Sequence, residues 1–107
     1  MSIKLYSRDA EFTILGQLLT DSKLVNKVDG IVGPEDFYFE ENREVYKAIL
    51  RSFKEKKSTD AILVISYLQE SKVMSHDEWM DLLYNMVSIR GIDSDLELYI
   101  EEVLDKS

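Results

Sequence analysis

The sequence contains no cysteine, one proline and four glycines in 107 residues. Without cysteine the chain cannot form a disulfide, a thiolate zinc site or a thiol nucleophile, which suits a reducing compartment. So few prolines and glycines exclude collagen and low-complexity chains. No apolar run approaches the roughly 18 residues of a membrane-spanning helix, and the N-terminus lacks the apolar core of a signal peptide. We expect a cytoplasmic protein that folds as a single domain over residues 1–107.

The sequence also has few basic residues relative to acidic ones. The chain has 13 Lys and Arg residues against 21 Asp and Glu residues, which gives a formal net charge of -8. The average field of such a protein repels phosphate backbones and anionic lipid surfaces. We therefore expect no tight direct binding of nucleic acid and no binding to membranes.

Apolar residues recur at helical spacing in nearly every segment, and no stretch of four or more residues alternates cleanly with period two. The pattern predicts an all-α domain, one compact body of about six helices joined by short loops. The predicted elements cover residues 8–19, 21–30, a helical turn from Pro34, 41–56, 62–68, and two helices that follow capping boxes at 75–78 and 94–97.

The boundaries of these helices come from capping residues. Ser7 and the segment 58–60 are predicted N-caps, and Ser75 and Ser94 each precede a glutamate by three residues, as in a capping box. Segment 62–68 is dense in β-branched residues and could also form a strand. We favour the helix because its leucines and tyrosine share one helical face.

The sequence offers little catalytic chemistry. His76 is the only histidine, and it has no nucleophile or metal ligand set nearby, which favours a solvated side chain over a general base. Residues 93–97 imitate the start of a calcium loop, but Leu98 and Leu104 replace its essential glycine and glutamate. Phosphate-binding and hydrolase motifs are absent. We predict no catalytic, cofactor-binding or metal-binding residue.

Aromatic residues are the remaining candidates for function. Phe37, Tyr38 and Phe39 follow the only proline, and three consecutive aromatic side chains cannot all face the core. We expect Phe37 to be buried, and Tyr38 or Phe39 to be partly exposed and to contact a partner. Half-buried packing of all three is the alternative. Trp79 is a third candidate contact, although its register with the neighbouring leucines favours the core.

Three blocks of the sequence, taken together, resemble the N-terminal domain of DnaB-type replicative DNA helicases. These blocks are Ala10-Glu-Phe-Thr-Ile-Leu-Gly16 with Leu18-Leu-Thr-Asp21, then Pro34-Glu-Asp-Phe-Tyr38, then Arg43-x-x-Tyr46-x-Ala48-Ile-Leu50. The likeness extends over about residues 9–107. Residues 73–78 replace a glycine pair that is common in the family, and 89–94 replace a Thr-Pro-x-x-x-Asn segment. These departures are typical of a divergent member, such as one encoded by a phage or plasmid.

The resemblance implies a compact orthogonal bundle of about six helices, the globular head of the helicase N-terminal domain. It also implies a non-catalytic role in assembly of the hexamer collar and in docking of primase, with other helicase protomers as further partners. Trp79 occupies an aromatic position of the family, and with Tyr38 it is an expected primase contact. In the family a helical hairpin follows this head, and a C-terminal RecA-like domain uses ATP and Mg. Neither is present in the 107 residues, so we expect a monomer or weak dimer.

Three alternatives stay open at this point. The chain could be a free-standing mimic of the head that regulates the helicase or its primase. It could also be a primase-type helicase-binding module, since that module resembles the head in fold. A small acid-base enzyme would need a cleft with perturbed carboxylates.

Overall fold

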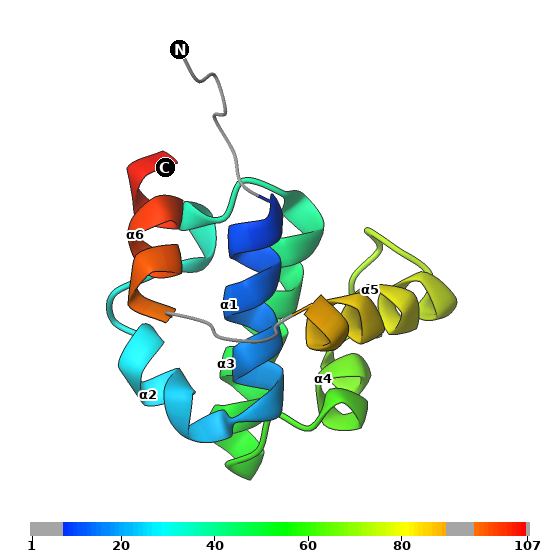
Figure 1. Ribbon diagram of the computed structural model, residues 1–107. Coiled ribbons are helices and arrows are strands. Elements are labelled where there is room, and N and C mark those ends of the chain that lie inside the picture. The colour runs from blue at the N-terminus through cyan, green and yellow to red at the C-terminus, as the bar shows by residue number, and fades with distance from the viewer. Residues whose placement is uncertain (1–7, 90–95, 107) are drawn as a thin grey trace.

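The computed structural model describes residues 8–89 and 96–106, and this part of the chain is helical without any β-strand (Figure 1). The all-α prediction is therefore confirmed. The radius of gyration is 12.9 Å, close to the roughly 13 Å of a compact domain of this length. The elements are α1 (Arg8–Thr20), η1 (Ser22–Leu24), α2 (Val25–Val28), η2 (Pro34–Asp36), α3 (Glu40–Lys56), α4 (Ala61–Leu68), α5 (His76–Ile89) and α6 (Leu96–Lys106).

Helix α1 lies at the centre of the bundle. It packs against α3, α5 and α6, and Figure 1 shows α2 and α6 on one side of it with α4 and α5 on the other. Nine of its 13 residues are buried, as expected for a helix that is apolar on nearly every face. The other helices thus share one core that is organised around α1.

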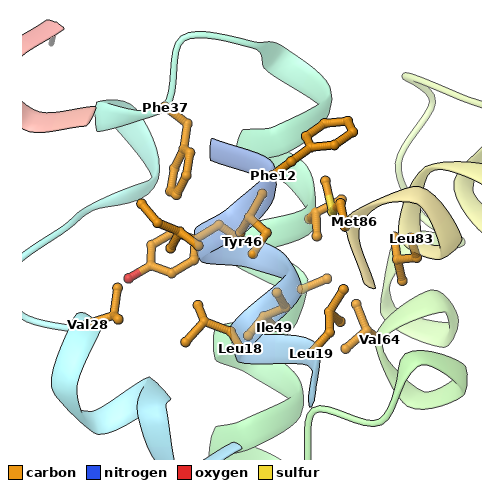
Figure 2. Close-up of a cluster of buried hydrophobic side chains, with 14 of the residues drawn as sticks. Phe12, Leu18, Leu19, Val28, Phe37, Tyr46, Ile49, Val64, Leu83 and Met86 are labelled. Atoms are coloured by element: carbon orange, nitrogen blue, oxygen red, sulfur yellow. The ribbon is translucent and has the colours of Figure 1, made fainter. Parts of the chain in front are cut away.

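The core brings together side chains from every part of the described chain. Figure 2 shows how the two leucines that end the buried run of α1 meet residues of α3, α4 and α5. The labelled members of this cluster are Phe12, Leu18, Leu19, Val28, Phe37, Tyr46, Ile49, Val64, Leu83 and Met86. Each is 8% exposed or less. Burial of this apolar surface is the main source of the domain's stability.

The helix starts follow the predicted caps wherever the structure describes them. The Asp60 side chain accepts a hydrogen bond from the Ile62 amide at 2.9 Å, so segment 62–68 is helical and not a strand. The Ser75 and Glu78 pair forms both bonds of a capping box, at 2.8 and 3.2 Å. The predicted cap at Ser7 and the box that begins at Ser94 lie outside the described residues.

One buried hydrogen bond joins the turn between α3 and α4 to the central helix. The Thr59 hydroxyl, in a residue 2% exposed, donates to the Leu18 carbonyl at 2.6 Å. That carbonyl lies in the last turn of α1, where no residue of the helix itself can satisfy it. Thr59 therefore caps a helix that is 41 positions away in sequence.

We expect Thr59→Val to lower the free energy of unfolding by about 1–3 kcal/mol, because it leaves a buried carbonyl without a donor. Thr59→Ser keeps the hydroxyl and is the matched control, with a smaller loss from the missing methyl group. Urea unfolding followed by circular dichroism measures both. Equal stability of the valine and wild-type proteins would show that the bond contributes nothing.

Candidate functional site

The structure separates the three consecutive aromatic residues as predicted. Phe37 is 1% exposed, Tyr38 is 48% exposed, and Phe39 is half-buried. The rings of Tyr38 and Phe39 meet edge to face, with centroids 4.9 Å apart and an interplanar angle of 87°. This pair presents apolar surface together with a phenolic hydroxyl group just before α3.

A cation lies on the Phe39 ring of this pair. The Arg8 guanidinium carbon is 4.2 Å from the centroid of the Phe39 ring, and the Arg8 Nη1 is 3.7 Å from Glu41 Oε2. Stacking on an exposed ring contributes about 0.5–1 kcal/mol, and an exposed ion pair contributes less. We call Arg8, Tyr38, Phe39 and Glu41 the aromatic corner. Its parts come from the start of α1, from the segment before α3 and from the first turn of α3.

A buried carboxylate holds the backbone of this corner. Glu11 on α1 is 3% exposed; its Oε2 accepts from the Tyr38 amide and its Oε1 from Asn42 Nδ2, both at 2.8 Å. A buried charge is tolerated when donors surround it, and bonds to a carboxylate are stronger than neutral ones. Glu11 thus joins α1 to both the exposed segment and the first turn of α3.

The carbonyl groups of the segment are held from the other side. Arg43 Nη1 donates to the carbonyl oxygens of Phe37 and Tyr38, at 2.9 Å each. In the irregular backbone between η2 and α3, the Tyr38 N–H and the carbonyl groups of Phe37 and Tyr38 are therefore paired with side chains from two different helices. This pairing fixes the direction in which Tyr38 and Phe39 leave the core.

The proline-containing block supplies the remaining supports. Pro34 begins the η2 turn, and the Asp36 side chain accepts from the Gly33 amide at 2.8 Å. The Phe37 ring packs against the Tyr46 ring with centroids 5.0 Å apart. Tyr46 in turn donates its hydroxyl proton to the Val32 carbonyl at 2.7 Å. The block therefore shapes a turn that positions the aromatic corner.

Burial raises the pKa of Tyr46 well above its usual range, and the nearby carboxylates of Asp29, Asp36 and Glu35 raise it further. Both causes disfavour a phenolate. The hydroxyl group therefore remains protonated and continues to donate to the Val32 carbonyl at physiological pH.

Trp79 requires a correction. Its side chain is 1% exposed, so it offers almost no surface for direct contact with a partner. It lies on the buried stripe of α5 with Leu82, Leu83 and Met86, and α5 packs closely on α1. The helical register of Trp79 therefore indicated its position in the core correctly. Tyr38 and Phe39 remain as the candidate partner contacts.

Within 8–89 and 96–106, no group of three or more His, Asp and Glu side chains could hold a metal ion. His76 is exposed, and its Nδ1 lies 3.0 Å from Gln69 Nε2.

A hydrogen bond from Tyr67, aided by Arg51, lowers the pKa of the exposed Glu55 carboxyl. A lowered pKa is the opposite of what a general acid needs. The helices of this part of the chain are also too short or too polar to cross a membrane.

The supporting residues of the corner were present in the sequence blocks, but their roles were not predicted. Glu11 and Arg43 stand among the residues that define those blocks, and Asn42, which is fully buried, adjoins them. A glutamate inside the apolar run of the first helix was the available signal. Such a residue needs polar partners, and the sequence does not say where they come from.

Comparisons with known proteins give a consistent result. The model of the family described as "DnaB-like helicase N terminal domain" matches residues 3–105. The chain is 30% identical over 100 residues to the replicative DNA helicase DnaB of Nostoc sp., and 29% identical over 97 residues to a probable replicative DNA helicase of Trieres chinensis. These matches take in 90% and 91% of this chain, but only 11% and 21% of the relatives.

A solved structure shares the fold. The crystal structure of the N-terminal domain of DnaB helicase from Mycobacterium tuberculosis superposes with a TM-score of 0.83 at 24% sequence identity. The match covers 94% of this chain and 70% of the other. The arrangement of helices around α1 is therefore that of a known domain.

We expect Glu11→Ala to destabilise the domain by about 2–4 kcal/mol, since it leaves the Tyr38 amide and the Asn42 side chain without their acceptor. The rate of hydrogen exchange at the Tyr38 amide should rise by more than the lower free energy of unfolding alone would cause. Asp9→Ala, which removes an exposed carboxylate two residues earlier on the same helix, is the control. Unchanged exchange at Tyr38 would contradict the role assigned to Glu11.

A second prediction concerns alkaline pH. Because the folded-state pKa of Tyr46 lies above the unfolded value of about 10, the unfolded state loses its proton first as the pH rises. The stability that this group contributes is complete below about pH 10 and is lost above it. Tyr46→Phe should be about 1 kcal/mol less stable than wild type at pH 7, and this difference should shrink above pH 10. Urea unfolding at several pH values measures it, and a constant difference would contradict the assignment.

Proposed function

The chain belongs to the family of DnaB-like helicase N-terminal domains, and from this we propose that it is the interaction domain of a replicative helicase. Its proposed roles are to support assembly of the hexamer collar and to dock primase. The relatives it matches are named as replicative DNA helicases, and it spans 11% and 21% of their lengths. The domain is the non-catalytic part of such proteins. We propose that ATP and Mg bind to another part of the helicase. We also propose that the helicase acts in the cytoplasm.

The aromatic corner is the observation that supports docking through this face. Tyrosine and arginine are over-represented among the residues that dominate binding energy at protein interfaces. Here Arg8 of α1 stacks on Phe39, and Tyr38 stands on a backbone whose amide is held by Glu11 and whose carbonyl is held by Arg43. A surface that is ordered before binding loses less conformational entropy on association.

The charge of the domain favours a protein partner over DNA. With a net charge of -8, the domain repels the translocating strand at long range. Primase and neighbouring helicase protomers are the partners we propose. For the isolated chain we propose a monomer or weak dimer.

The test uses purified primase from the same replication system, titrated against the labelled chain. We expect Tyr38→Ala to weaken primase binding at least tenfold with an unchanged circular dichroism spectrum, because the exposed ring supplies contact area and not core packing. Leu98→Ala removes a side chain that is 59% exposed on α6, and as the matched control it should bind normally.

Two results would contradict this proposal at different levels. Normal primase binding by Tyr38→Ala would remove the corner from the docking surface. Absence of binding by the wild-type chain would reject primase docking by this domain altogether.

A further inference from the structure

A second exposed apolar surface lies on the opposite side of α1 from α6. Ile62 is 78% exposed, Tyr84 73% and Met80 48%, and all three belong to α4 or α5. Between these helices is an open hollow of about 370 Å³. Its lining consists of Ile62, Ile65, Ser66, Gln69, His76 and Met80. We call this surface the α4–α5 groove.

The groove is formed by one face of each helix. Its lining residues on α4 are spaced at i, i+3 and i+4, Gln69 at i+7 is the residue directly after that helix, and on α5 His76 and Met80 are one turn apart. Tyr84 lies one further turn along α5 and extends that stripe. The contact of Gln69 Nε2 with His76 Nδ1 at 3.0 Å joins the end of α4 to the start of α5. The floor is thus apolar, and polar groups meet at one end.

The segment of the chain that contains both helices is acidic. Residues 58–89, which contain both helices, have one lysine against five carboxylates, which is half of the net charge of -8. On α5, Asp77 and Asp81 are exposed and directly follow the lining residues His76 and Met80. The other three carboxylates have partners elsewhere: Glu70 lies 3.7 Å from Arg51 of α3, and Asp60 and Glu78 cap the starts of α4 and α5.

From this combination we propose that the α4–α5 groove docks a short amphipathic helix of a partner protein, with an apolar stripe flanked by lysine or arginine. An apolar groove between two helices receives side chains at i, i+3, i+4 and i+7 of a bound helix. The flexible Met80 side chain adapts to such side chains. The exposed carboxylates of Asp77 and Asp81, next to the lining residues on α5, attract basic flanks and repel acidic ones.

The proposal goes beyond the function proposed above, because the groove and the aromatic corner share no residue. The two surfaces can therefore be tested by separate variants. Tyr38→Ala should leave the groove's affinity for a helix unchanged, whatever its effect on primase.

The probe is a fluorescein-labelled synthetic peptide of 15 residues with leucines at helical spacing and lysines at the remaining positions. Two control peptides are matched to it. One carries glutamates in place of the lysines, and the other has the same leucines and lysines in scrambled order. Binding is measured by fluorescence anisotropy and mapped by ¹⁵N chemical shifts of the protein. We expect binding of the lysine peptide only, with shift changes in 62–69 and 76–84.

Substitutions then distinguish peptide binding in the groove from nonspecific attraction of the peptide to an acidic protein. Ile62→Glu, at a position that is mostly exposed, should reduce affinity at least tenfold, whereas Leu98→Glu on α6 should not. Asp81→Lys should weaken binding more than Glu101→Lys, which places the same charge change on α6 and leaves every core residue untouched. This second pair decides the question even where Ile62→Glu proves unstable.

Three outcomes would overturn the proposal. Equal binding of the glutamate peptide would remove the role of Asp77 and Asp81. Shift changes on another face, or equal losses in the groove and α6 variants, would place the peptide elsewhere. Concentration-dependent self-association that Ile62→Glu abolishes would assign the groove to a second copy of the chain.

Discussion

The aromatic corner depends on the buried carboxylate of Glu11. A charge at 3% exposure is stable only because the Tyr38 amide and the Asn42 side chain donate to it. Those donors belong to a segment and a helix about 30 residues away, so the carboxylate determines where the chain passes before α3. The segment has no regular structure of its own, and its direction is set by this contact and by Arg43.

Five residues of the family blocks hold this turn. Asp36, Phe37 and Tyr46 support it from within, while Glu11 and Arg43 hold its backbone from the two helices beside it. The aromatic side chains of Tyr38 and Phe39 leave this framework for the surface. The family blocks thus include part of the scaffold. Two surfaces of different chemistry lie on it: a cation stacked on aromatic rings at one side, and an apolar groove between α4 and α5 at the other.

Much of the fold was predictable because helix formation is local. The 3.6-residue spacing of apolar side chains located the helices, and Asp60, Ser75 and Glu78 marked starts that the structure confirms. Trp79 shows the limit of such reasoning. Its register correctly indicated the core, but its aromatic character also suggested a contact surface, and only the packing of α5 on α1 decides between the two.

The sequence by itself determined the helical class, the acidic charge, the absence of thiol chemistry and the approximate limits of the helices, because each depends on composition or on neighbours within a few residues. Tertiary structure alone decided that Glu11 meets Tyr38, that Arg8 stacks on Phe39, and that α4 and α5 leave a groove between them. These contacts join residues from different helices. Such pairings follow from how the apolar faces pack around α1, which no local pattern of residues contains.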